Sequence, residues 1–121
     1  MNFANTTTVN QDLSLDVGLE RTTTALVTTA TAYKKGDLLA LSDVNVLTHA
    51  VDEKTWDVIC KNDITAAEAT AMAAASVETP VLYAGKVNVA AVALNGTKLA
   101  TNKYAAARAK ATKNRIELAK V

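Results

Sequence analysis

The order of short strands is set by residues 25–60, which read ALVTTATAYKKGDLLALSDVNVLTHAVDEKTWDVIC. Val, Leu, Ile, Thr and aromatic residues dominate several runs in this segment, and such residues favour strands. Turn residues separate the runs, among them Lys35-Gly36-Asp37 and Ser42-Asp43. Several short strands in succession predict a small β-barrel or a sandwich-like core.

Two helices are predicted on the C-terminal side of this segment. Thr65 and Glu68 match a capping box, in which a hydroxyl and a carboxylate accept hydrogen bonds from amides at a helix start. A helix is therefore predicted from about Ala66 to Ser76. A second, Ala- and Lys-rich helix is predicted from about Asn102 to Lys113, closed by Asn114 in the left-handed conformation.

Strand patterns also surround the second helix. Residues 81–94 read VLYAGKVNVAAVAL and end at an Asn95-Gly96 turn, and residues 115–121 alternate as a short final strand. The predicted fold class is therefore α+β and β-rich, with two short helices. A chain of 121 residues suits one domain, and its aromatic content of only 4% predicts a small core for which oligomerisation is a common remedy.

The N-terminal segment has a different composition, with nine threonines among residues 1–31 and no proline. Within it, Leu13, Leu15, Val17 and Leu19 alternate with small or polar residues, which places them on one face of a strand. No turn links this strand to a neighbouring one, so residues 1–24 are predicted to form an extended arm that joins the sheet of another protein. Residues 25–121 are predicted to be the domain, and deletion of the arm is predicted to cost little folding stability.

Candidate catalytic and metal-binding residues are few and isolated. The only histidine, His49, lies in a Val-rich segment, and the only cysteine, Cys60, is interpreted as a small core residue. Two such ligands are too few for a zinc site. The carboxylates Asp52, Glu53 and Asp57 are interpreted as part of a solvated loop. The sequence therefore predicts no catalytic residue, no metal and no enzyme activity.

Cofactor and targeting signals are also missing from the sequence. The glycines at 18, 36, 85 and 96 are too far apart for a phosphate-cradling loop, so no cofactor is expected. The opening residues show no secretory signal, and no run of apolar residues is long enough for a membrane span. One unpaired cysteine is consistent with a cytosolic origin.

The C-terminal end is basic although the formal net charge of the chain is only +1. Residues 97–121 carry a single acid, Glu117, and seven basic residues: Lys98, Lys103, Arg108, Lys110, Lys113, Arg115 and Lys120. A solvated helical face, or one that meets an acidic protein partner, is favoured over nucleic-acid binding, because only Tyr104 could supply a stacking ring among these cations.

The order of AYKKGDLLAL, the central helix, PVLYAGKVNVAAV and AAARAKATKNRIELAKV resembles the lambda-type head decoration proteins of tailed bacteriophages, over about residues 25–121. The resemblance implies a β-tulip-type domain that assembles as homotrimers at local threefold axes of the capsid. It implies that the N-terminal arm engages the major capsid protein. It also implies synthesis in the bacterial cytoplasm, residence on the outer surface of the virion and stabilisation of the shell.

Two other classes of function remain open at this point. Another virion component, such as a head fibre base or a tail-tube protein, shares the β-rich composition and the extended arm. A small nucleic-acid-binding protein that uses the basic C-terminal helix is the rival from a different class.

Overall fold

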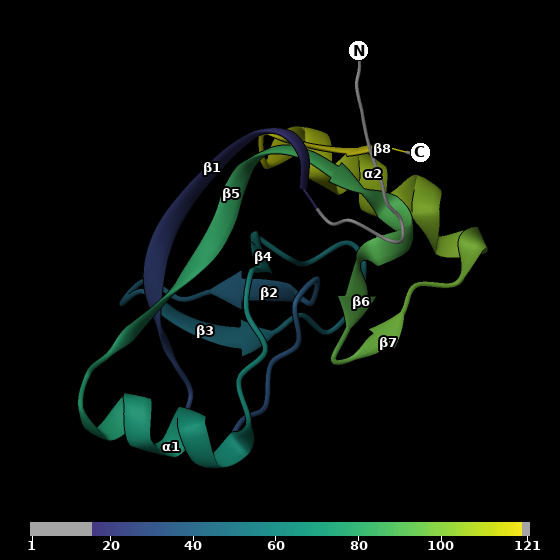
Figure 1. Cartoon of the computed structure of the whole chain (residues 1–121). Coiled ribbons are helices and arrows are strands. Elements are labelled where there is room, and N and C mark those ends of the chain that lie inside the picture. Colours follow the sequence, from purple (N-terminus) through teal and green to yellow (C-terminus); the bar gives the residue numbers. More distant parts are fainter. Residues whose placement is uncertain (1–15, 120–121) are drawn as a thin grey trace.

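The computed structural model describes residues 16–119 and shows a strand-rich α+β domain with a mixed sheet and two α-helices (Figure 1). In chain order the elements are β1 (Asp16–Val27), β2 (Leu38–Leu41), β3 (Val46–His49), β4 (Val58–Cys60), α1 (Ala66–Ala74), β5 (Glu78–Asn88), the 3-10 turn η1 (Val89–Ala91), β6 (Ala93–Leu94), β7 (Thr97–Lys98), the 3-10 turn η2 (Thr101–Lys103), α2 (Tyr104–Lys113) and β8 (Ile116–Ala119). The predicted α+β, β-rich class is confirmed at this level.

The strand pairings close a ring. The strands β1, β3, β2, β4 and β5 pair in that order, and β5 pairs back to β1. The strand β8 adds to β5 in parallel, beyond the point where β4 ends. A closed ring removes the free edges that an open sheet would expose along these pairings.

The longest pairing joins β1 to β5. These two strands lie side by side and curve together along one side of the molecule in Figure 1. The register runs from Asp16 opposite Val87 to Leu26 opposite Glu78, and three irregularities interrupt it near the N-terminal end. Such bulges increase strand twist and curvature, which suits a pair that wraps around a small core.

This pairing corrects the predicted division of the chain. The boundary at residue 24 falls inside β1, so residues 16–24 belong to the sheet of the domain itself. The sequence prediction failed because the partner strand, β5, lies about sixty residues further along the chain, where no local turn signals it. Val17 and Leu19 lie in β1, whereas Leu13 and Leu15 lie outside the described residues.

The core has two clusters, which lie on opposite faces of the central strands. Leu38 and Ile59 pack with Trp56 and with the buried face of α2, whereas Leu39 and Val58 pack on the other face, towards α1. Neighbouring side chains of a strand point to opposite faces. Burial on both faces explains why β2 and β4 read as continuous apolar runs rather than as alternating ones.

The helices follow their sequence signals closely. Both hydrogen bonds of the predicted capping box are present, since the Thr65 hydroxyl accepts from Glu68 N and the Glu68 carboxylate accepts from Thr65 N. The helix α1 ends at Ala74 rather than at Ser76. The helix α2 ends at Lys113 as predicted, but Arg115, with φ +65°, is the left-handed residue rather than Asn114.

Gly36 marks the place where two distant loops come closest. A Cβ at this position would lie 2.3 Å from the carbonyl oxygen of Ala91, and the residue has φ +97°. No L side chain fits this space or readily adopts this conformation. The KKGD turn can therefore dock against η1, which brings Asp37 into the interior.

Candidate functional site

His49 has a structural environment. Its Nε2 lies 2.7 Å from the carbonyl oxygen of Ala32, and its ring stacks on Tyr33 with centroids 5.1 Å apart. Its Nδ1 lies 3.7 Å from Asp37 Oδ2 and has no hydrogen-bond partner in the described part of the chain. The histidine thus packs over the Tyr33 ring rather than facing a nucleophile.

Asp37 is a buried carboxylate that the sequence pattern indicated only as a turn residue. It is 1% exposed. Its Oδ1 accepts from Gly96 N and its Oδ2 accepts from Lys34 N, each at 2.9 Å. It therefore ties the KKGD turn to the β6–β7 turn. The signal that could have identified it is its position directly before the apolar run of β2.

The three carboxylates predicted to lie in a solvated loop have specific structural roles, and for Glu53 the prediction is wrong. Glu53 is 5% exposed and its Oε1 lies 3.7 Å from Lys103 Nζ. Asp52 caps its own turn by accepting from Lys54 N and from the Thr55 hydroxyl, and these bonds lower its pKa. Asp57 accepts from Leu41 N at 2.9 Å.

Cys60 lies in the core, as predicted, and its burial raises the pKa of the thiol from 9.0 to about 11. The Sγ atom donates to the carbonyl oxygen of Asn62 at 3.0 Å. Within residues 16–119, no group of three or more His, Cys, Asp or Glu side chains could hold a metal ion.

We expect Cys60 to be unreactive in the folded chain. At pH 8 an aromatic disulfide reagent should modify it about a hundredfold more slowly than in the unfolded chain, because only the thiolate of an exposed cysteine attacks. The pKa of the thiol is higher in the folded chain than in the unfolded chain. The free energy of unfolding should therefore fall as the pH rises from about 9 to about 11, where the thiol ionises in the unfolded chain first. Rapid labelling at the unfolded rate would contradict the buried position, and Cys60→Ala provides the blank.

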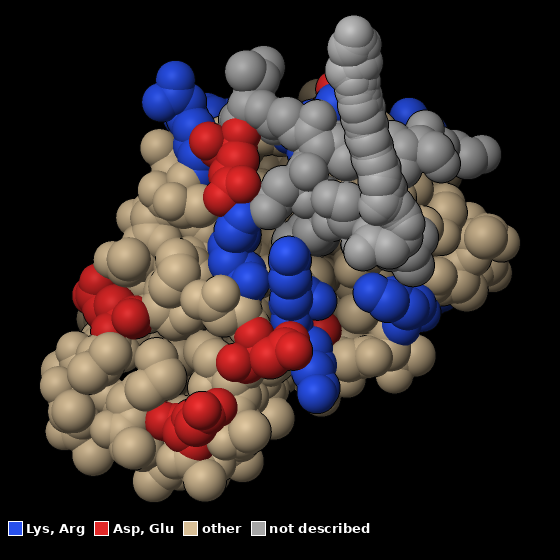
Figure 2. Space-filling model, viewed as in Figure 1, with Lys and Arg blue, Asp and Glu red and all other residues tan. Residues whose placement is uncertain are grey.

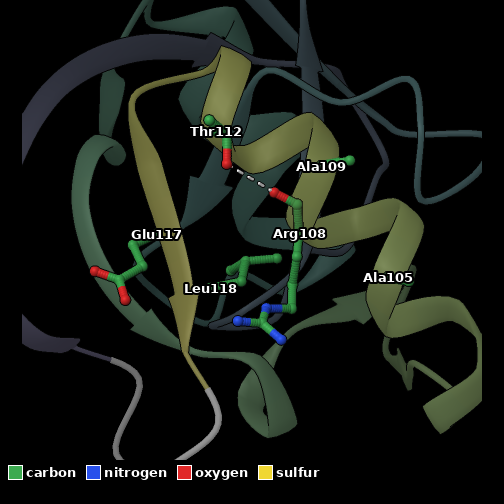
Figure 3. A pocket seen from close by; sticks show the side chains of 6 residues that line it. All are labelled: Ala105, Arg108, Ala109, Thr112, Glu117 and Leu118. Atoms are coloured by element: carbon green, nitrogen blue, oxygen red, sulfur yellow. Dashed lines mark hydrogen bonds between the residues drawn. The ribbon is translucent and has the colours of Figure 1, made fainter.

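The basic residues of the C-terminal end are dispersed, with several forming local contacts. Lys98 donates to the Ala91 carbonyl oxygen, and Lys103 faces Glu53. Arg108 lines a groove of about 320 Å³ between α2 and β8, where Figure 3 shows the Glu117 side chain projecting from β8 away from the Arg108 guanidinium. Lys113 and Arg115 line a separate groove. Lys120 lies outside the described residues. The described basic residues named here therefore occupy several different local environments.

The strand β1 offers a main-chain edge, and it is the candidate docking site. Leu26 N donates to the Asn45 carbonyl oxygen, and the Thr24 carbonyl oxygen accepts from the Asn45 side chain. These backbone groups point to the edge of β1 that faces away from β5. Backbone groups alternate along a strand, so the N–H and C=O of Thr22 point to the same edge. Among the described residues, no strand pairs with this edge between Asp16 and Ala25.

Pro80 supports this assignment of the strand edges. It lies opposite Thr24 on β5. Because the Thr24 groups point away from β5, this is a non-hydrogen-bonded pair, where the N–H that proline lacks is not needed. N-terminal to Thr24, no described strand pairs with the edge of β1 that faces away from β5, and this part of β1 contains Leu19 and Val17.

No family model, curated protein or solved structure matches this chain. In the part of the chain that the structure describes, no helix has the length and apolar character needed to cross a membrane.

Proposed function

We propose that the chain is a head decoration protein of a tailed bacteriophage. It binds the exterior of the assembled, expanded capsid as a homotrimer at local threefold axes and stabilises the shell. The observation that carries the proposal is the edge of β1 upstream of Thr24, with which no described strand pairs; in the sequence this part of β1 overlaps the alternating stretch from Leu13 to Leu19. A closed ring with one long exposed edge is a suitable scaffold for strand addition.

The resemblance over residues 25–121 supports the same reading, and a β-tulip-type domain is the finer description of the fold that we propose with it. The partner is the major capsid protein, and neither a membrane nor a nucleic acid is needed. Main-chain pairing at the β1 edge supplies affinity. The side chains of Leu13, Leu15, Val17 and Leu19 set the register of that pairing.

The mechanism is binding linkage without chemistry, so the chain acts as a structural protein rather than an enzyme. A protein that binds the expanded shell more tightly than its open or disassembled forms stabilises that shell by mass action. Three linked copies raise the effective concentration of each edge at its site. The chain is made in the host cytoplasm and resides on the outer surface of the virion.

We expect Thr22→Pro to abolish capsid decoration while the domain stays folded. Proline removes the N–H that points to the open edge, and its ring obstructs an incoming strand, whereas no bond to β5 is lost. Thr22→Ala changes the side chain but keeps this N–H, so it is the matched control. Binding to expanded capsids, measured by co-sedimentation, should fall at least tenfold for the proline variant and stay within about twofold for the alanine variant.

Thermal melting must show that both variants retain the fold. Equal capsid binding by a folded Thr22→Pro variant would exclude this edge as the docking element. Binding to DNA that falls steeply with salt, without any capsid binding, would instead favour the nucleic-acid-binding alternative.

A further inference from the structure

Two grooves of opposite charge lie along β5. The first, which we call the acidic groove, has a volume of about 450 Å³ beside α1. Its lining includes the apolar residues Ile64, Met72 and Pro80 together with three carboxylates, which we call the rim, and no cation: Asp63, Glu68 and Glu78. The lower left of Figure 2, over α1, shows acidic and neutral side chains but no basic ones.

The three rim carboxylates bond only neutral donors. Asp63 accepts from Lys35 N, Glu68 accepts from Thr65 N, and Glu78 accepts from the Thr24 hydroxyl. No ion pair to a described cation offsets their charge. The groove therefore combines an apolar lining with three negative charges that no described ion pair offsets.

The second feature, which we call the basic surface, is formed by Tyr83, Lys113 and Arg115 around a groove of about 400 Å³. Tyr83 is the extra residue of β5 where the register shifts between Arg21 opposite Ala84 and Thr22 opposite Leu82, so a bulge directs its exposed ring outwards. Lys113 is the last residue of α2 and Arg115 lies two residues beyond it, and neither is ion-paired with a described carboxylate. Asp57 also lines this groove but is engaged by Leu41 N.

The two features line different grooves, and no ion pair joins their described side chains. Both are held by β5, with Pro80 at the acidic groove and Tyr83 at the basic surface, and three residues of strand separate them by roughly 10 Å. Another copy can satisfy either feature, because each copy presents the complement of both. Long basic side chains can lay their apolar stems on Met72 and Pro80 while their charged ends reach the carboxylate rim.

We propose that copies of this chain associate head to tail, with the basic surface of one copy in the acidic groove of the next. A contact between two different patches is heterologous, and heterologous contacts close into rings when the rotation allows. That the ring contains three copies rests on the proposed function, whereas the contact between two copies does not depend on it. Because exposed ion pairs are individually weak, the association is salt-sensitive and concentration-dependent.

The test is sedimentation equilibrium of the full chain and two variants in low salt. The basic-surface variant carries Lys113→Glu and Arg115→Asp, the latter because Asp tolerates a left-handed backbone. The acidic-groove variant carries Glu68→Gln, which can still cap α1, and Glu78→Lys. Lys54→Glu alters an exposed charge outside both features and is the control. Each double variant alone should have a dissociation constant raised at least about tenfold, with the control unchanged.

Mixing the two double variants is the decisive measurement. The mixture should form mixed dimers, because the intact basic surface of one variant meets the intact acidic groove of the other. Unfolding cannot produce such rescue. Because the two variants carry opposite net charges, the mixture is also measured at about 0.15 M salt, where general attraction between distant exposed charges is largely screened. A wild-type chain that stays monomeric at about 100 μM, variants that associate like wild type, or a mixture without rescue would overturn the contact. Capsid binding is measured separately, so wild-type self-association without decoration would reject the proposed function and leave this contact standing.

Discussion

Deletion of residues 2–24 should unfold the domain. The deletion leaves only Ala25–Val27 of β1, removes most of its pairing with β5 and opens the ring of strands. Both edges of the ring would then expose unpaired backbone groups, and the small core has no further strand to replace the lost one. Circular dichroism should show loss of the cooperative thermal transition.

Deletion of residues 2–15 is the matched control, because it leaves every described element intact. This shorter deletion should melt within a few degrees of the full chain. It should nevertheless weaken capsid binding, because it removes Leu13 and Leu15 from the proposed docking strand. A 2–24 deletion that melts cooperatively near the full chain's temperature would show that β1 is dispensable for folding.

Asp37→Ala should lower the free energy of unfolding by about 3–5 kcal/mol, a large part of the stability of a small domain. The substitution removes the acceptors of Gly96 N and Lys34 N at a position that is 1% exposed, so two part-buried backbone donors lose their partners. It also leaves a cavity between the KKGD turn and the β6–β7 turn. Urea denaturation followed by Trp56 fluorescence measures the loss.

Asp37→Asn separates the hydrogen bonds from the shape of the side chain. Asparagine fills the same space but has only one carbonyl oxygen that can accept a hydrogen bond. Its NH2 group would replace the second carboxylate oxygen and would face a backbone N–H, which is also a donor. We expect it to lose about half as much stability as the alanine variant. Equal stability of all three proteins would contradict the structural role assigned to the carboxylate.

Local signals in the sequence predicted local structure well. The capping box at Thr65 and Glu68 gave the start of α1, and the Ala-rich run gave the buried face of α2 at Ala107 and Ala111. These features depend on residues within one or two turns of each other. The β-rich runs likewise gave the strands between residues 25 and 60 at approximately the right places.

Long-range features were not visible in the sequence. The arm boundary at residue 24 was wrong because the pairing of β1 with β5 depends on distant residues. Glu53 was misplaced because its cation, Lys103, lies fifty residues away and the two meet only after α2 folds against the 50–57 loop. The Tyr83 bulge and the opposite charges of the two grooves likewise exist only in the assembled sheet.

Electron microscopy of expanded capsids of the encoding phage, incubated with the purified chain, tests the central claim most directly. The account predicts density for three copies at each local threefold position on the outer surface, with the edge of β1 paired to a strand of the capsid protein. The Thr22→Pro variant should leave the same positions empty. Capsids that remain bare with the folded wild-type chain at saturating concentration would contradict the account.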